Sequence, residues 1–456
     1  MEMSYALESV VPSIVNDSAV DLPLNFSVLY VSGRQIPREY RNLRHEIYCI
    51  ETNFLPDDQL FDGNDAGAEH VLIYDGGELV AATSCTPIGK SDFAHHSGIA
   101  SQELQGCFYS SRSCVAKPYR RKGLFALLVY LAMRRNRQAG LDSWVAYVEP
   151  GDIPAKKVLH YDYPRAAKPR QIIGTNGKIY EVVACLGSIH ESMIRTFNAM
   201  PQDLQNWVRT HCFVDEIAVH VTQKVKQFYA CRYFEAVRQG RLSRRQYLAS
   251  ISNKHHFVRW TTRILGSAVA MCDDPDLRRH YTAHLSGEIN HELWLENDIR
   301  YLGGDLAFLL NQTVTDPGVL NFQFIQEALT HCRRDPIVFL GVPIAIEGIS
   351  GFLDTAFIEG LKGCIRSWGY DEPSKGCTFY ASHVHTDGAD EGHWVGTLRV
   401  IARVVRNEQQ LQLILNIVSL VVDALHRAYD HYMNQPGCAL DAAALGDIPS
   451  EKTSLN

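Results

Sequence analysis

The sequence predicts two domains, an N-terminal α/β domain built on a mixed sheet and a C-terminal all-α helical bundle. Three observations support this prediction. The chain has 456 residues, more than one hydrophobic core usually organises. Between residues 26 and 190, several short runs alternate apolar and polar residues, which is the period of a strand. From residue 241 to 435, almost every run instead repeats its apolar residues with the period of a helix.

Composition and charge favour a folded protein of the cytoplasm. Apolar residues make up 46% of the chain and charged residues 21%, and the net charge of −7 gives no general attraction to nucleic acid or to an anionic membrane. The 12 cysteines form no CxxC pair and no secretory signal opens the sequence, so we expect reduced thiols. Two apolar stretches, 337–353 and 411–425, are short and interrupted by polar residues, which indicates core helices rather than membrane spans.

The elements of the first domain follow an arm, residues 1–25, that has no clear period. A polar helix that carries Arg41 and Arg44 comes before an acidic loop, and a tight turn at 75–77 between two alternating runs predicts a β-hairpin. Strands are expected at 26–33, 70–74, 78–85, 111–116, 144–150 and 178–187, and a long helix is expected at 126–137.

A basic, glycine-containing turn between a strand and a helix is the strongest functional signal of this domain. Its candidate binding residues are Arg120, Arg121, Lys122, Gly123 and Leu124. Such a turn points backbone N–H groups at one spot and opens a helix with its positive dipole end, and the three basic side chains add charge. The turn is therefore a candidate binding site for a pyrophosphate.

This turn resembles the cofactor loop of the GNAT acyltransferases. Arg120 and Gly123 match the loop, while Phe125 stands where the family has Gly or Ala and narrows the room for the pantetheine phosphate. Coenzyme A and an acyl carrier protein therefore both stay open as the acyl donor. The resemblance to the autoinducer-synthase and N-acyl amino acid synthase branch covers about residues 26–190 and extends to Arg44, Tyr48, Asp62, Asp65 and His70.

The resemblance implies N-acyl transfer to an amine or amino acid. By it, Arg44, Asp62 and Asp65 would position the amine or its carboxylate. Glu149, at the end of a predicted strand, is a candidate general base, and a solvated strand-end carboxylate would give the same pattern. A basic cluster would match the acidic surface of a carrier protein; its members are Arg120, Arg121, Lys122, Arg134, Arg135 and Arg137.

Residues 191–240 are predicted to be a helical bridge and residues 241–435 the bundle, before a small polar tail at 436–456 that we expect to be disordered. His255 and His256 fall at a predicted helix start, where polar residues are common. The helices of the bundle are expected at 244–252, 255–272, 275–303, 322–332, 337–366, from 377 into the 390s, and at 396–433.

One predicted helix of the bundle carries a candidate metal site. His284, Glu288 and His291 lie at i, i+4 and i+7, so two imidazoles and a carboxylate would share one face. Metal ligands have this spacing, and so does the polar face of an ordinary amphipathic helix. His284 would either bind the metal or support a ligand, and Asp298 would either orient His291 or face water.

A second signal is Glu347, which lies inside a long apolar run. A carboxylate buried without a partner is costly, so a cation, a hydrogen-bond donor or a proton must compensate it. A third helix adds His383, His385, Asp387, Asp390 and His393. Three helices that present nitrogen and oxygen ligands inwards can hold iron with positions left open for dioxygen.

The run LRRHYTAHLSGEINHELWLENDIRYLG, followed by a buried Glu and a late His/Asp/His helix, resembles the heme-oxygenase-like diiron oxidases, which are also met as iron-containing redox enzymes. In that family a Glu and a His come from the first ligand helix, a Glu from the second, and HxxxDxxH from the third. Glu288, His291 and Glu347 match the first two helices.

The third motif of this chain departs from the family's spacing. Asp390 and His393 are the expected ligands, and either His383 or His385 is the remaining histidine. A one-residue π-bulge in the helix would bring His385 into place, and a three-residue insertion would instead bring His383 into place. The resemblance implies one or two ferrous irons.

Together the two resemblances imply a bifunctional biosynthetic enzyme. The first domain would acylate an amine, and the second would use Fe(2+), O2 and an external reductant for desaturation, decarboxylation or C–C cleavage, or N-oxygenation of the product. Natural-product biosynthesis is the expected setting, with no nucleic-acid partner, and a homodimer stays open. Two alternatives remain: an acyltransferase with a metal-free helical docking domain, and an oxidase with a non-catalytic GNAT domain that binds a carrier protein.

Overall fold

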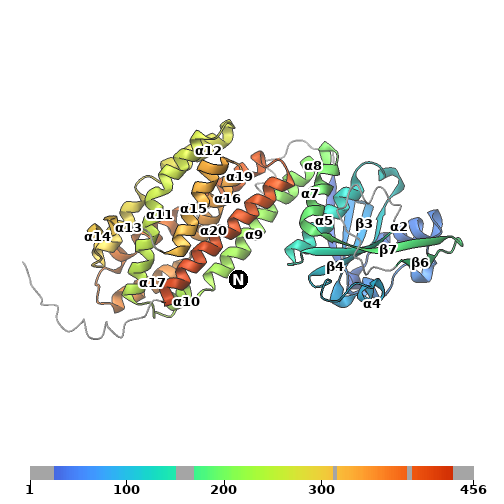
Figure 1. Cartoon of the computed structure of the whole chain (residues 1–456), viewed down its shortest axis with the longest axis horizontal. Coiled ribbons are helices and arrows are strands. Elements are labelled where there is room, and N and C mark those ends of the chain that lie inside the picture. The colour runs from blue at the N-terminus through green and yellow to red at the C-terminus, as the bar shows by residue number, and fades with distance from the viewer. Residues whose placement is uncertain (1–24, 150–168, 312–315, 388–392, 435–456) are drawn as a thin grey trace, which may run out of the picture. The chain divides into compact units, whose positions relative to one another are not determined.

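The computed structural model describes residues 25–149, 169–311, 316–387 and 393–434 (Figure 1). The expected N-terminal arm up to residue 24, the expected tail and Asp390 lie outside these residues. The chain divides into two compact units. We call them the sheet unit, which runs up to Phe213 and includes Arg406–Gln412, and the helical unit, which holds Val214–Val405 and continues from Leu413.

A seven-stranded mixed sheet forms the centre of the sheet unit, in the order β1-β2-β3-β4-β5-β7-β6. Among the described strands only β4 and β5 pair in parallel. The α/β prediction is confirmed, and β6 is a strand that the sequence analysis did not predict. The strands are β1 (Phe26–Ser32), β2 (Glu69–Asp75), β3 (Glu78–Pro87), β4 (Cys107–Val115), β5 (Ser143–Val148), β6 (Arg170–Ile173) and β7 (Ile179–Ser188).

Helices cover both faces of this sheet (Figure 1). Tyr40 and Leu43 of α2 (Arg38–Arg44) pack with Leu72 of β2 in one apolar cluster. Successive residues of a strand point to opposite faces, so the equally buried Val71 and Ile73 need cover on the other side, where α5 (Leu124–Gln138) contacts β2, β3 and β4. Burial on both faces explains why β2 is a continuous apolar run.

Strand β4 is irregular in two places that shape the site described below. Opposite β3, its register shifts between Ala82 and Ser84, and Arg112 at this bulge takes a left-handed backbone with φ 52°. Opposite β5, pairing covers only Cys107–Tyr109 and Ser143–Val145. β4 and β5 therefore pair in parallel only at their starts and separate beyond Tyr109 and Val145.

In its described residues the helical unit consists of helices without strands, as predicted. The bridge expected at 191–240 is mostly helical, with α7 (Ile189–Ala199) and α8 (Gln202–Val208) in the sheet unit. From Val214 onwards the helices belong to the helical unit. They are α9 (Val214–Tyr229), α10 (Arg232–Arg238), α11 (Arg244–Ala270), α12 (Pro275–Gly287), α13 (His291–Tyr301), α14 (Leu306–Asn311), α15 (Pro317–Glu327), α16 (Gly341–Gly351), α17 (Thr355–Ser367), α18 (Thr378–Asp387), α19 (His393–Val404) and α20 (Glu408–Asn434), whose first turn belongs to the sheet unit.

Predictions about helix continuity were wrong in both directions. The helices expected at 337–366 and 396–433 are each divided, into α16 and α17 and into α19 and α20. The expected helix at 275–303 is broken into α12 and α13, because Asn290 takes a left-handed backbone with φ 71°. The helices expected separately at 244–252 and 255–272 form the single helix α11. His255 and His256 therefore lie in mid-helix, and both are buried rather than exposed at a helix start.

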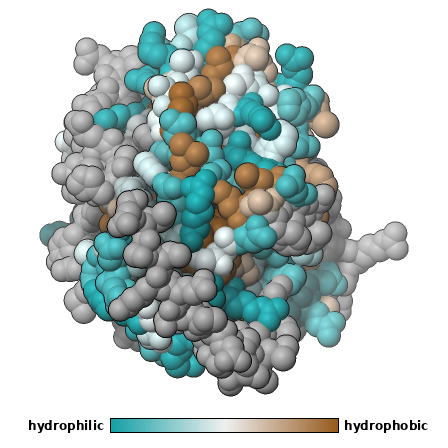
Figure 2. Space-filling model, turned by 90° about the vertical axis from the view of Figure 1, so that its left-hand side faces the viewer, coloured by the Kyte–Doolittle hydropathy of each residue, from teal (hydrophilic) through white to brown (hydrophobic). Residues whose placement is uncertain are grey.

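One described helix, α20, is long and apolar enough to cross a membrane, and α16 with the segment before it forms such a candidate only together with α17, across a bend of 70°. Of the apolar window in α20, 56% is buried inside the protein, as in a core helix. The side of the helical unit in Figure 2 shows a broken band of apolar residues among hydrophilic ones.

Candidate functional site

Four side chains of the helical unit converge in a chain of contacts that we call the His–Glu cluster: His284, Glu288, His291 and Glu347. His284 Nε2 lies 3.4 Å from Glu288 Oε1 and 3.3 Å from Glu347 Oε1. The other oxygen of Glu288 lies 2.9 Å from His291 Nδ1. Both histidines and Glu347 are buried, and Glu288 is half-buried. The fold therefore brings together candidate site residues that lie more than fifty positions apart in the sequence.

The cluster depends on the break between α12 and α13. His284 lies in the last turn of α12, Glu288 is its C-terminal cap, and His291 is the first residue of α13. Asn290 lies between them with its left-handed backbone. The prediction that one continuous helix aligns these residues on a stripe was wrong, yet the turn gives Glu288 contact with both imidazoles.

Glu347 has the partners that its burial requires, as predicted. It lies in the apolar helix α16, and the Thr397 hydroxyl of α19 donates a hydrogen bond of 2.8 Å to its Oε2. His284 supports its other oxygen. Thr397 Oγ1 also lies 3.4 Å from His280 Nε2, so a buried polar network extends behind the carboxylate.

His383 of α18 approaches the cluster from a further helix. Its ring centroid lies 5.0 Å from that of His291. Its Nδ1 lies 2.8 Å from the carbonyl oxygen of Phe379, a contact that makes Nδ1 the donor and leaves the lone pair on Nε2. His385 also lies in α18 and His393 opens α19, and the side chains of both lie outside the described residues.

Asp298 has neither of the two roles that we predicted for it. Its carboxylate is fully buried and accepts hydrogen bonds from the backbone N–H groups of Thr378, at 2.8 Å, and Phe379, at 3.0 Å. It therefore caps the N-terminus of α18 from about eighty residues away in sequence, and so positions the helix that carries His383. Burial raises the pKa of Asp298 to about 6, although the two N–H groups oppose the shift.

The electrostatics favour a charged Glu288 carboxylate in the cluster and a neutral His383 imidazole next to it. Burial opposes ionisation of Glu288, but hydrogen bonds from His284 and His291 outweigh it and hold its pKa well below the usual range. Burial lowers the pKa of His383 to about 4. A neutral imidazole has a lone pair free for a metal ion.

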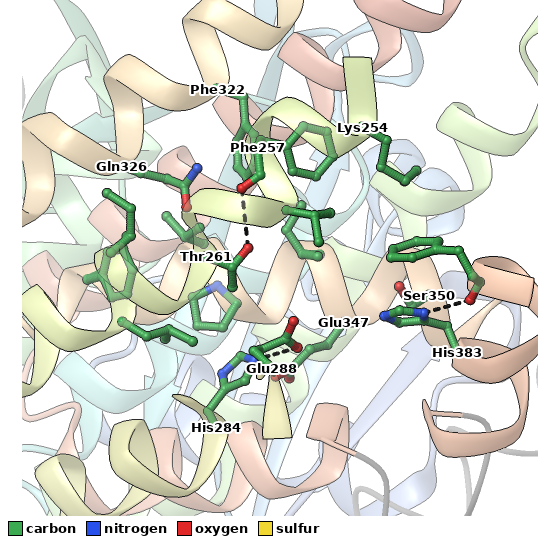
Figure 3. A pocket seen from close by; sticks show the side chains of 18 residues that line it. Lys254, Phe257, Thr261, His284, Glu288, Phe322, Gln326, Glu347, Ser350 and His383 are labelled. Carbon is green, nitrogen blue, oxygen red and sulfur yellow. Dashed lines mark hydrogen bonds and ion pairs between the residues drawn. The ribbon is translucent and has the colours of Figure 1, made fainter. Parts of the chain in front are cut away.

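A cavity of about 80 Å³ adjoins the cluster. In Figure 3, His284, Glu288 and Glu347 gather at one side of it and Lys254 lies on the far side. Apolar side chains make up most of the remaining wall, among them Phe257, Val258, Ile264, Leu265, Phe322, Phe339, Val342 and Ile346.

In the sheet unit, Arg44 and Asp65 are buried and pair with each other. Arg44 Nη1 lies 2.9 Å from Asp65 Oδ1 and donates to the carbonyl oxygen of Leu60 at 3.1 Å. Burial opposes the charge of Arg44, but Tyr40 and Asp65 raise its pKa. Neither Arg44 nor Asp65 lines the large cavity of this unit.

Asp62 lies at the wall of that cavity, whose volume is about 490 Å³. It caps the short helix α3 (Gly63–Gly67) through Asn64 N–H at 2.8 Å and pairs with Arg112 Nη2 at 2.6 Å. Burial opposes the ionisation of Asp62, but Arg112 and the backbone N–H groups lower its pKa. Glu149 is exposed just beyond the end of β5 and does not line the cavity.

Arg112 is a residue that the sequence analysis missed. The bulge in β4 aims it at the acidic loop, where Nη1 donates to the carbonyl oxygens of Gln59, at 2.7 Å, and Leu60, at 2.8 Å. Tyr109 and Tyr147, on the two strands that pair only at their starts, line the same cavity. A bulge leaves no reliable mark in a strand of nine residues, so no local signal identified Arg112.

The basic turn lies at the start of α5, as predicted. Gly123 caps the helix with φ 83°, and a Cβ there would lie 2.3 Å from Cδ of Pro201, so only glycine fits. Arg121 also has a left-handed backbone, and Leu124 is buried. Arg120 is exposed but pairs with Glu51 at 2.6 Å.

The other members of the predicted basic cluster are partly engaged within the protein. Arg135 pairs with Glu69 at 2.8 Å, and Arg137 lies 3.3 Å from Glu408. Arg134 is buried. Arg121 and Lys122 are exposed, so the positive surface that a partner can reach at this turn is smaller than the sequence suggested.

Comparisons with known proteins give remote structural likenesses. No protein-family model and no curated protein matches the chain. A TenA homolog from Pseudomonas syringae is 14% identical, with a TM-score of 0.42, over 49% of this chain and 93% of that chain. A domain with a heme oxygenase-like fold from Shewanella denitrificans is 16% identical, with a TM-score of 0.41, over 48% and 93%. A CoA-dependent acyl-homoserine lactone synthase is 17% identical, with a TM-score of 0.32, over 39% and 91%.

The similar structures thus fall into the two predicted kinds, acyltransferase and heme oxygenase-like. With TM-scores below 0.5 these likenesses carry no argument, and the fold and the roles of individual residues rest on the geometry given above.

Proposed function

We propose that this chain is a bifunctional biosynthetic enzyme. The sheet unit transfers an acyl chain to an amine or amino acid, and the helical unit binds iron and oxidises the product with dioxygen. The observation that carries the proposal is the convergence of His284, Glu288, His291 and Glu347 beside an apolar cavity. A bundle core rarely holds such a set of charged and polar groups unless they serve a ligand.

The donor set fits iron. Imidazole nitrogen and carboxylate oxygen meet at the cluster, and the described residues that line the cavity include no thiol. Bound iron would supply the activation of dioxygen that removes hydrogen from a substrate. The residues that would hold it are Glu288, His291 and Glu347, completed by Asp390, His393 and either His383 or His385.

The remaining residues of the site hold these ligands and exclude water. Thr397 and His284 each engage one oxygen of Glu347, and this fixes the carboxylate. The Nδ1 contact of His383 with Phe379 leaves Nε2 as its ligand nitrogen. The apolar wall keeps bulk water from the reacting carbon.

In the sheet unit, we propose that the turn at Arg120–Leu124 holds the phosphate of coenzyme A or of a carrier protein's pantetheine arm. The amine then occupies the cavity of about 490 Å³, where Asp62 forms part of the wall. Arg44 and Asp65 act as positioning residues, since they pair behind that wall. Glu149 does not line this cavity, so as the proposed base it would take the amine proton through water.

The oxidation is a desaturation, a decarboxylation or C–C cleavage, or an N-oxygenation, supported by an external reductant. An acyl carrier protein is the proposed partner, with one or two irons as cofactor, in the cytoplasm and in the biosynthesis of natural products.

Iron content tests the metal site directly. The full chain, loaded with ferrous iron without oxygen and desalted, should retain at least one iron per chain. Glu347→Gln should lose most of it, because a neutral amide is a poor iron ligand. Glu359→Gln, which changes an exposed carboxylate of α17, is the control and should keep the wild-type content. A wild-type content well below one iron would favour a metal-free docking domain.

The products of a host that expresses the intact chain test the order of the two reactions. With Glu347→Gln, mass spectrometry should detect the un-oxidised amide in place of the wild-type product. Identical product profiles would contradict an oxidase. If the chain yields no amide from any acyl donor, the sheet unit acts as a receptor for a carrier protein and not as an acyltransferase.

A further inference from the structure

Lys254 lies on the side of the helical-unit cavity away from the His–Glu cluster (Figure 3). It belongs to α11, in a run of polar residues that also contains the buried His255 and His256. A lysine that lines a mostly apolar cavity is unusual, because an ammonium group taken out of water needs compensation.

Aromatic rings supply part of that compensation. The Lys254 ammonium lies 5.4 Å from the ring centroids of Phe257 and Phe379, and 5.2 Å and 5.9 Å from those of Tyr380 and Tyr429. Four such contacts hold the charge in one place.

No anion from the part of the chain that the structure describes completes the arrangement. Among the described residues, no carboxylate forms an ion pair with Lys254, and burial lowers its pKa to about 8. An ammonium with that pKa is still largely protonated at neutral pH, so a charge faces the cavity without a counter-ion. Glu288 and Glu347 lie on the other side and are already paired with His284.

We propose that Lys254 is the counter-ion for a carboxylate on the molecule that is oxidised in this cavity. The carboxylate would bind at Lys254, and the adjoining carbon chain would lie along the apolar wall towards the His–Glu cluster. This inference rests on the proposed function and names its substrate class, an aliphatic acid. An N-acylated amino acid, the proposed product of the sheet unit, carries such a carboxylate.

The cavity volume limits how much of the substrate it encloses. About 80 Å³ is less than the roughly 150 Å³ of a protein cavity that binds benzene. The cavity therefore encloses only a short part of the substrate, and binding of the carboxylate head group is the property to test.

The experiment compares ligands that differ only in the head group. Calorimetric titration of the metal-free full chain with hexanoate, hexanol and hexylamine avoids carboxylate binding to iron. Wild type should bind hexanoate about tenfold more tightly than hexanol and hexylamine, because a charge pair removed from water raises the affinity about tenfold or more. Lys254→Met should remove the preference for hexanoate and bind hexanol as wild type does.

Two measurements separate this effect from misfolding. Lys254→Met keeps an unbranched side chain, one heavy atom shorter, and removes a buried charge, so its melting temperature should equal or exceed that of wild type. Lys362→Met, which changes a lysine paired with Glu359 on α17, is the matched control and should keep the hexanoate preference.

Equal binding of hexanoate and hexanol to wild type would overturn the inference, and so would a preference that survives in Lys254→Met. In either case Lys254 would be a packing residue held by its rings. The proposed function fails separately, through the absence of iron in the loaded wild-type chain, because the titration needs no iron.

Discussion

The pKa of a polar side chain inside the bundle depends strongly on the groups that surround it. His255 Nε2 lies 3.3 Å from Glu296 Oε1, while its neighbour His256 has Arg259 and His255 as its charged surroundings. Burial, and then the charge of Arg259, lower the pKa of His256 to about 4. The ordinary value of about 6.5 applies in the unfolded chain.

This shift predicts a loss of stability in mild acid. As the pH falls from about 6.5 towards 4, the unfolded chain binds a proton that folded His256 does not bind, so the free energy of unfolding falls. Urea unfolding at about pH 7 and about pH 5 measures how much stability is lost between these pH values. In His256→Leu this loss of stability should be about 2 kcal/mol smaller than in wild type. His331→Gln, at an exposed histidine, should leave the loss unchanged. A His256→Leu curve parallel to that of wild type would show that this histidine does not titrate as described.

At the scale of elements, the start of α18 depends on a contact that is distant in sequence. Asp298 of α13 satisfies two backbone N–H groups at the start of α18. Most helices of this chain with a side-chain cap use the residue just before the helix, as α17 does with Asp354. The position of His383 beside the cluster therefore depends on the packing of α13 against α18.

Loss of this cap should weaken both stability and metal binding. Asp298→Ala leaves two buried N–H groups without their acceptor, so we expect about 2 kcal/mol less stability in urea unfolding. Iron retention should also fall, since His383 moves with α18. Asp371→Ala, at an exposed aspartate, should change neither quantity. Unchanged stability in Asp298→Ala would mean that water replaces the carboxylate.

The basic turn allows a similar test in the sheet unit. Gly123 and Gly140 have nearly the same backbone, φ 83° and 86°, but only at Gly123 would a Cβ collide with Pro201. Gly123→Ala should abolish acyl transfer by displacing the start of α5, whereas Gly140→Ala should cost only the backbone strain, about 1 kcal/mol. Amide formation by the two variants gives the comparison. Equal activity would exclude the turn from the reaction.

At the scale of the whole molecule, each unit has its own apolar core and its own candidate site. A mutation in one such unit should have little effect on the other unit, because the free-energy effects of mutations that share no contacts are additive. Glu347→Gln should therefore leave amide formation within about twofold of wild type, and Gly123→Ala should leave the iron content unchanged. If either variant impairs the other reaction strongly, the two sites are coupled.

Sequence patterns alone determined the two fold classes, the β-hairpin at 75–77 and the basic turn. They also singled out His284, Glu288 and His291, because the three residues have a metal-ligand spacing, and Glu347, because an ionisable group in an apolar run stands out locally. Only the tertiary structure decided that Asn290 breaks the helix between Glu288 and His291 and that Asp298 caps α18.

The roles of Arg112 and Lys254 likewise came from the tertiary structure. The polar run around Lys254 suggested a break between two helices, whereas α11 continues and these side chains point into the interior. Periodicity and composition reflect neighbours along the chain. Contacts between residues far apart in sequence depend on how whole elements pack, and no local pattern records that packing.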